Sequence, residues 1–233
     1  MTRTEEHAPG RHVDLVGEPD RGVVLLWHGR GVDNRDAVRP LAQQIAAAGV
    51  LALAADWSSE APDHGRSDLL TSVRHARVTA EHHGHDPSRL VVAGWSLGGT
   101  AAVGLAVHAK RLGIELGGVV LIAPGDGPRA LDAISGAALP ATFTDGAGRC
   151  RIDLLYGEHD ELATPDLVSG LELRLRAASW STSLHSIDAD HGEVVGARYD
   201  ERADRYVRSS QPRAIAAAGL TADAVVQVVT SSR

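Results

Sequence analysis

The stretch Leu90-Val-Val-Ala-Gly94-Trp-Ser96-Leu-Gly98-Gly-Thr-Ala-Ala102 decides the fold. Its first half is a short apolar run typical of a buried strand, and its second half begins a helix of small residues. Between them stands a Gly-x-Ser-x-Gly pattern, and a side chain at either Gly94 or Gly98 would collide across a tight turn. The pattern therefore predicts a strained strand-to-helix turn that presents the Ser96 hydroxyl at a helix N-terminus, where developing negative charge is favoured.

Apolar runs rich in Val, Leu and Ile alternate with amphipathic segments along the chain. This alternation predicts an α/β fold with a doubly wound, mostly parallel sheet of about seven strands and helices on both faces. The expected strands are 12–17, 22–28, 50–55, 89–95, 117–123, 151–156 and 181–187. The first two, joined by Glu18-Pro-Asp-Arg21, are expected to form an antiparallel hairpin. The expected helices are 35–48, 67–83, 97–112, 165–178 and 193–209.

The remaining segments complete the expected architecture. Residues 124–150 begin with Pro-Gly-Asp-Gly-Pro and predict a lid-like loop with one short helix at 129–134. Pro212 is expected to break the last core helix, and 221–229 fits either a helix or a strand. The length of 233 residues favours a single domain, 1–233, without a large cap domain.

Composition excludes several classes of protein. The chain is 43% hydrophobic and 23% charged, which is typical of a folded domain and not of a disordered one. Its net charge of −7, without a basic and aromatic stretch, disfavours nucleic-acid binding. The polar start and the lack of an apolar run approaching about 20 residues disfavour a membrane span. Cys150 is the only cysteine, so no disulfide can form within one chain, and a cytoplasmic location is expected.

A serine hydroxyl is a weak nucleophile until a base removes its proton, and an acid must orient that base. Asp160 follows the predicted strand 151–156, and His191 follows the predicted strand 181–187. The carboxyl ends of parallel strands meet at one edge of a sheet, so we expect Ser96, Asp160 and His191 to lie together as the catalytic residues. Alternatives are His159 or His185 as the base, and Glu158, Glu161, Asp188 or Asp190 as the acid.

In this order, the motifs resemble those of the α/β-hydrolase superfamily over about residues 12–210. The supporting motifs are Leu25-Leu-Trp-His28-Gly29-Arg30-Gly31, Asp56 with His64-Gly-Arg-Ser67, Asp86-Pro-Ser-Arg89 and Gly157-Glu-His-Asp160. Within the superfamily the chain is similar to small dienelactone-hydrolase-like and carboxylesterase-like proteins. It differs from dienelactone hydrolases proper in having Ser96 where they use cysteine, and its His-Gly-Arg-Gly stands where lipases have His-Gly-Gly-Gly. The resemblance implies an oxyanion hole made by the backbone N–H groups of Leu97 and Arg30.

These observations lead to an expected function. A serine hydrolase of this kind cleaves a small-molecule carboxylic ester or thioester through an acyl-enzyme, and it needs neither a metal nor an organic cofactor. One alternative keeps the same three residues for C–C bond hydrolysis, lyase or acyl-transfer chemistry, and another is a non-catalytic ligand-binding homologue. A homodimer is possible on this sequence, whereas nucleic-acid and membrane partners are not expected.

Other residues carry weaker signals. Trp57, Trp95, Leu97 and Phe143 are candidates for the apolar walls of a substrate pocket. Arg30 either meets an anionic substrate group or faces water or a nearby acid. His28 is expected to bond within its own loop, and Cys150 to be an ordinary half-buried thiol. The spacing of the remaining histidines does not converge on a metal, so solvated side chains are expected at His75, His82, His83 and His85.

Overall fold

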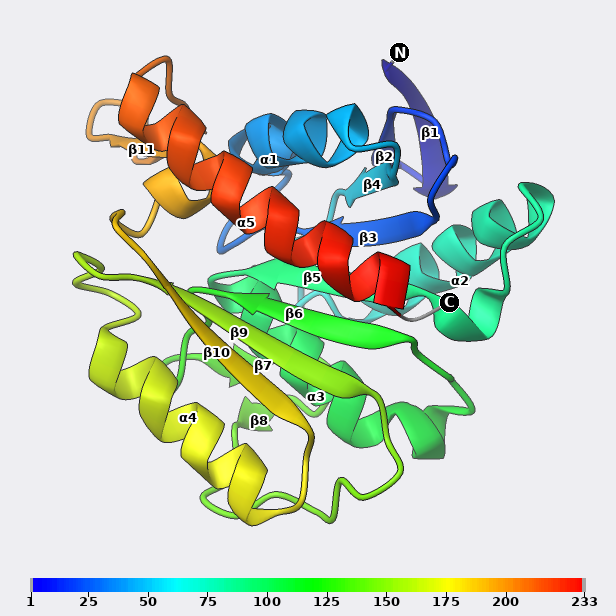
Figure 1. Ribbon diagram of the computed structural model, residues 1–233, viewed down its shortest axis with the longest axis vertical. Coiled ribbons are helices and arrows are strands. Elements are labelled where there is room, and N and C mark those ends of the chain that lie inside the picture. Colours follow the sequence, from blue (N-terminus) through cyan, green and yellow to red (C-terminus); the bar gives the residue numbers. More distant parts are fainter. Residues whose placement is uncertain (1, 232–233) are drawn as a thin grey trace.

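A computed structural model describes residues 2–231, and in this part of the chain eight strands form one sheet in the order β1-β2-β4-β3-β5-β6-β9-β10 (Figure 1). These strands are β1 (Thr2–Ala8), β2 (Arg11–Val16), β3 (Val23–Trp27), β4 (Leu51–Ala55), β5 (Val91–Trp95), β6 (Gly118–Ile122), β9 (Arg151–Gly157) and β10 (Thr182–Ile187). The β1/β2 and β2/β4 pairs are antiparallel and all others are parallel. The predicted doubly wound, mostly parallel sheet is confirmed.

The predicted hairpin between the first two strands is wrong. Strand β2 pairs with β1 and β4, whereas β3 lies between β4 and β5. All five residues of β3 are buried, so both of its edges need strand neighbours, and the apolar strands β4 and β5 provide them in parallel. The Pro-Asp turn instead leads the chain past β4, where Arg21 N–H donates to the Gly49 carbonyl at 2.7 Å.

Helices cover both faces of the sheet. On one face lie α1 (Arg35–Ala47) and α5 (Pro212–Ser231), and on the other lie α2 (Arg66–His82), α3 (Leu97–Leu112) and α4 (Pro165–Ala177), with the short 3₁₀ turn η1 (Pro87–Arg89) before β5 (Figure 1). Four of the five predicted helices are confirmed within one residue at each end.

The fifth predicted helix, 193–209, is wrong. This segment contains a 3₁₀ turn η2 (Glu193–Val195) and a hairpin of β11 (Ala197–Asp200) and β12 (Arg205–Arg208). Gly196 has a φ of 80°, which ends η2 and starts the hairpin. Val194, Val195 and Ala197 are apolar because all three side chains are buried under α5 and β12. Their spacing in the sequence happens to match that of an amphipathic helix.

Helix α5 decides the alternative left open for 221–229 and corrects two expectations, on the role of Pro212 and on the length of the apolar runs. Pro212 begins this helix, as proline can at a first turn whose N–H groups lack helical partners, and 221–229 is helical. Its 20 residues have the length and hydropathy of a membrane span, which the sequence was not expected to contain. Half of the apolar window is buried against α1 and the sheet, as in the core helix of a folded domain.

The segment 124–150 forms a small hairpin of β7 (Leu131–Asp132) and β8 (Ala137–Ala138) in place of the expected helix at 129–134. The Asp132 carboxylate accepts the N–H groups of Ile134 and Ser135 at 2.8 and 3.1 Å, a local turn that competes with a helix. Arg174 of α4 pairs with Asp126 and donates to the Pro140 carbonyl at 3.0 Å. The segment is therefore anchored to α4 at two points.

Candidate active site

Ser96 occupies the turn between β5 and α3 with φ 55° and ψ −121°, a conformation that costs a side-chain-bearing residue about 1–3 kcal/mol. A Cβ added to Gly94 would stand 2.1 Å from the Gly98 carbonyl oxygen. A Cβ on Gly98 would stand 2.4 Å from the His28 carbonyl oxygen. Both obstacles are backbone atoms, so only glycine fits on either side of Ser96, as the sequence pattern predicted.

A chain of hydrogen bonds joins the three predicted catalytic residues. Nε2 of His191 lies 3.0 Å from Oγ of Ser96, and Nδ1 of His191 lies 2.7 Å from Oδ2 of Asp160. The Asp160 side chain is 0% exposed and that of His191 is 8% exposed. Because the carboxylate can only accept, Nδ1 carries the proton and the lone pair of Nε2 faces the serine hydroxyl. This is the protonation that a general base requires.

Backbone amides fix the orientation of the acid. Oδ1 of Asp160 accepts the N–H groups of Leu162 and Ala163, each at 2.8 Å. With one carboxylate oxygen committed to these donors, the other is directed at the imidazole.

The alternative bases and acids lie outside this chain of hydrogen bonds. His159 pairs on the surface with Asp188 at 2.7 Å, and His185 is exposed. The carboxylate of Asp190 instead accepts the N–H groups of Gly192 and Glu193, both at 2.8 Å, and so shapes the turn that carries His191. Glu158 accepts the Ser186 hydroxyl, and Glu161 is exposed.

Two aromatic rings support His191. The indole N–H of Trp95 donates to the His191 carbonyl at 2.9 Å, and the two ring centroids are 5.3 Å apart. Tyr206 of β12 lies 5.7 Å from the imidazole and 4.9 Å from the indole, and burial raises its pKa to about 12. Tyr206 lies in the segment that was predicted to be a helix, and no motif in the sequence marks this residue.

The loop after β3 lies directly against Ser96, since a Cβ on Gly29 would be 3.1 Å from the Ser96 Cβ. Over residues 2–231, the backbone N–H groups of Leu97 and Arg30 have no hydrogen-bond acceptor. One belongs to the first turn of α3 and the other to this loop. Unbonded amides beside a nucleophile are the groups from which an oxyanion hole is made.

His28 holds this loop in place. It is 0% exposed, and burial lowers its pKa to about 4, so the ring is neutral at pH 7. Nδ1 donates to the Gly29 carbonyl at 2.8 Å, while Nε2 accepts the Asn34 N–H at 3.2 Å. Its ring stacks on Trp57 at 5.5 Å. The expected bonding within its own loop is confirmed.

The predicted aromatic pocket walls are wrong. Trp57 is 0% exposed, Trp95 is 1% exposed, and Phe143 lies 5.4 Å beneath the Arg174 guanidinium. All three are core side chains, because the indoles stabilise the loops of His28 and His191 and the phenyl ring anchors segment 124–150. Of the predicted walls, only Leu97 is among the residues that line the cleft next to Ser96. This cleft has a volume of about 310 Å³ and is lined by Arg30, Ser59, Glu60, His64, Leu97, Arg129, Leu131 and Ala133.

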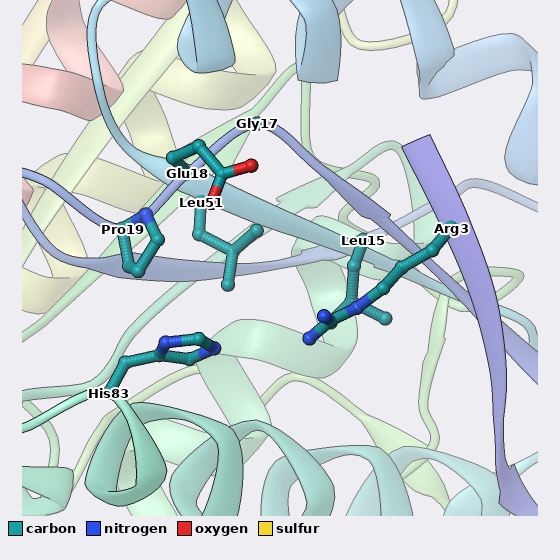
Figure 2. Close-up of a pocket in the computed structure, with 7 residues that line it drawn as sticks. All are labelled: Arg3, Leu15, Gly17, Glu18, Pro19, Leu51 and His83. Atoms are coloured by element: carbon teal, nitrogen blue, oxygen red, sulfur yellow. The ribbon is translucent and has the colours of Figure 1, made fainter. Parts of the chain in front are cut away.

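A second pocket lies at the opposite end of the sheet, where β4 begins. Figure 2 shows Arg3 of β1 and His83 extending toward one another across it. Its volume of about 40 Å³ has room for only a few water molecules.

The remaining histidines and the cysteine are not arranged as a metal site. Within residues 2–231, no group of three His, Cys, Asp or Glu side chains could hold a metal ion. The expectation of solvated side chains is wrong for His75, which pairs with Glu5 at 3.3 Å, and for His85, which bonds to the Pro19 carbonyl at 2.6 Å. Burial raises the pKa of the Cys150 thiol to about 11, in agreement with an unreactive half-buried thiol.

Known proteins resemble this chain in family and in fold. A family model described as alpha/beta hydrolase fold matches residues 32–166, which include Ser96 and Asp160. The chain is similar to the structure of a bacterial heroin esterase, with 19% identity and a TM-score of 0.73 over 98% of this chain and 84% of that one. An esterase/lipase from an uncultured bacterium has 16% identity and a TM-score of 0.70, with coverage of 98% and 85%. A thermostable esterase from Pseudomonas putida ECU1011 has 16% identity and a TM-score of 0.65, with coverage of 100% and 81%. No curated protein matches the chain.

Proposed function

Because the chain belongs to the α/β-hydrolase fold family, we propose that it is a serine esterase that hydrolyses small-molecule carboxylic esters through an acyl-enzyme. The observation that carries the proposal is the hydrogen-bonded chain from Ser96 through His191 to Asp160. The esterases with the same fold support it. Cys150, the only cysteine, supports a reducing location, and we propose the cytoplasm.

The first half of the reaction acylates the serine. Oγ of Ser96 attacks the ester carbonyl carbon as Nε2 of His191 takes the hydroxyl proton. The carbonyl electron pair moves onto oxygen, and the N–H groups of Leu97 and Arg30 bind the resulting oxyanion. When the tetrahedral intermediate collapses, the bond to the leaving oxygen breaks and His191 returns its proton to the departing alcohol.

The second half releases the acid. Water enters in place of the alcohol. His191 removes a proton from this water, and the resulting hydroxide adds to the acyl carbon. Collapse of this second intermediate frees the carboxylic acid and restores the Ser96 hydroxyl. Asp160 stays ionised throughout and stabilises the imidazolium that forms twice in each cycle. Thioesters offer the same carbonyl carbon with a thiol leaving group, so the proposal includes them.

A serine substitution tests the proposal. We expect Ser96→Ala to abolish turnover of p-nitrophenyl acetate and labelling by a fluorophosphonate probe, with an unchanged circular dichroism spectrum. Ser210→Ala is the matched control, because Ser210 is exposed and, within residues 2–231, shares no hydrogen bond with Ser96, His191 or Asp160. Full activity in Ser96→Ala, or a folded wild-type protein that neither turns over the ester nor reacts with the probe, would show that the chain is not a serine esterase.

A further inference from the structure

The cleft next to Ser96 is built from three separate connections of the chain. Arg30 comes from the loop after β3, Glu60 and His64 from the loop after β4, and Arg129 from segment 124–150. The first two loops are joined by a pair of hydrogen bonds, in which Gly31 N–H donates to the Ser59 hydroxyl at 3.0 Å and Ser59 N–H donates to the Gly31 carbonyl at 3.2 Å. Since Arg30 and Leu97 also carry the proposed oxyanion amides, the cleft adjoins the scissile carbonyl.

The arginines of the cleft are free to bind a ligand. Arg30 and Arg129 are exposed, and within residues 2–231 neither guanidinium makes an ion pair or a hydrogen bond. Most other arginines of the chain are engaged, as Arg151 is with Asp153 at 2.8 Å. A guanidinium is a planar donor that matches a carboxylate, so two unoccupied ones facing one cleft favour an anionic ligand.

The charge of the cleft differs from that of the whole chain. Arg30 and Arg129 contribute two positive charges, and Glu60 is the one acid among the residues that line the cleft, which gives 2 − 1 = +1. The protein as a whole carries a net charge of −7. A local positive site in an acidic protein draws an anion to one place on its surface. A net charge of +1 matches a single negative charge.

His64 is held at the cleft by a strained turn. Its φ of 56° lies in the left-handed region, which a residue with a side chain rarely adopts. The Asp63 carboxylate fixes this turn by accepting the N–H groups of Gly65 at 3.0 Å and Ser67 at 2.9 Å. A Cβ on Gly65 would be 2.5 Å from the Trp57 ring, so the turn is also packed against the core. The imidazole thereby adds a further donor beside the two arginines.

We propose that the substrate is an ester that carries one carboxylate within a few bonds of the scissile carbonyl, and that Arg30 and Arg129 bind this carboxylate. The inference rests on the proposed esterase function and deepens it. A half-ester of a short dicarboxylic acid has this chemistry, and its size suits a cleft of about 310 Å³.

Paired chromogenic esters test the inference. Mono-4-nitrophenyl glutarate carries the carboxylate on the acyl side, and methyl 4-nitrophenyl glutarate is the same molecule with that charge removed. A second pair, 3-butanoyloxy-4-nitrobenzoate and 2-nitrophenyl butyrate, carries or lacks a carboxylate on the leaving group. We expect kcat/KM to be at least about tenfold higher for the anionic member of one pair, which identifies the side that the arginines bind. Added salt is expected to reduce this preference.

Charge substitutions assign the preference to the cleft. Arg129→Gln and Arg30→Gln are each expected to lower the anionic-to-neutral ratio of kcat/KM by about tenfold, mainly through KM. Glu60→Gln is expected to raise the ratio, because it removes the one negative charge of the cleft. Arg74→Gln is the matched control and should leave the ratio unchanged. Arg74 is an exposed arginine of α2 that makes no ion pair or hydrogen bond within residues 2–231 and does not line the cleft.

The outcomes separate this inference from the esterase function. If neutral and anionic esters are hydrolysed equally well in both pairs, or if Arg129→Gln and Arg74→Gln change the ratio alike, the carboxylate site is wrong and the esterase function stands. If a folded protein hydrolyses none of the four esters, both proposals fail.

Discussion

Replacement of Asp160 by asparagine tests how the acid directs the histidine. In the native site, Oδ1 accepts two amide N–H groups at 2.8 Å and Oδ2 accepts Nδ1–H of His191 at 2.7 Å. Asparagine has one oxygen and one NH₂ group. The two backbone donors require the oxygen, because an NH₂ group placed against them would leave three donors facing one another. The NH₂ group must then face Nδ1.

This arrangement inverts the protonation of the imidazole. Nδ1 has to accept the amide hydrogen, so the ring proton moves to Nε2, which then points an N–H at the Ser96 hydroxyl and can no longer take its proton. We expect kcat for p-nitrophenyl acetate to fall by about 10⁴-fold, equivalent to about 5.5 kcal/mol of transition-state stabilisation. The structure of the site should be retained, since every hydrogen bond keeps a donor and an acceptor.

The assay is nitrophenol release at pH 7, together with near-ultraviolet circular dichroism to confirm the native fold. Asp188→Asn is the matched control, because Asp188 pairs with a surface histidine, His159, and should have no effect on kcat. A loss of less than about tenfold in Asp160→Asn, with the fold intact, would refute the orientation argument.

Three further predictions concern the elements that support the site. Gly94→Ala should lower the free energy of unfolding in urea by about 3 kcal/mol or more, because its Cβ would meet the Gly98 carbonyl at 2.1 Å; Gly170→Ala in α4, where the added Cβ meets nothing within 4 Å, should be neutral or stabilising, and equal losses would contradict the clash. Lowering the pH from 7 to 5 should reduce the free energy of unfolding by about 2 kcal/mol through His28. The pKa of His28 is about 4 in the folded protein and about 6.5 in the unfolded chain, so only the unfolded chain takes up the proton in this range. In urea titrations of His28→Asn, this loss of unfolding free energy should be absent. An identical pH dependence of the unfolding free energy in the wild type and in His28→Asn would exclude His28 as its source. Tyr206→Ala should reduce kcat about tenfold with little change in KM by loosening the packing around His191, whereas Tyr206→Phe should retain the wild-type kcat; equal losses in the two variants would show that the hydroxyl, and not the ring, supports the site.

The sequence predicts the parts of this molecule whose pattern has a local physical cause. The Gly94-Trp-Ser96-Leu-Gly98 turn is predictable because backbone crowding excludes any other residue at the two glycines. The placement of Asp160 and His191 beside Ser96 follows from the rule that parallel strands end at one edge of the sheet.

The features that the sequence did not predict depend on contacts between distant segments. Strand β1 is polar and lies at the sheet edge, so its pairing with β2 leaves no periodic apolar pattern, and Thr4 bonds instead to Asp14 at 2.7 Å. The β11–β12 hairpin looks like a helix because residues on both sides of Gly196 are buried under other elements. Trp57 and Trp95 look like pocket walls until the loops that they support are seen.

The walls of the cleft come from loops that carry neither Asp160 nor His191, and this has an evolutionary consequence. Residues 58–66 and 124–150 can acquire insertions or new side chains while the proposed catalytic residues, at the ends of β5, β9 and β10, keep their geometry. Selection for a different range of ester substrates would therefore first alter these two segments. Descendants of this chain should diverge there and retain the proposed catalytic residues.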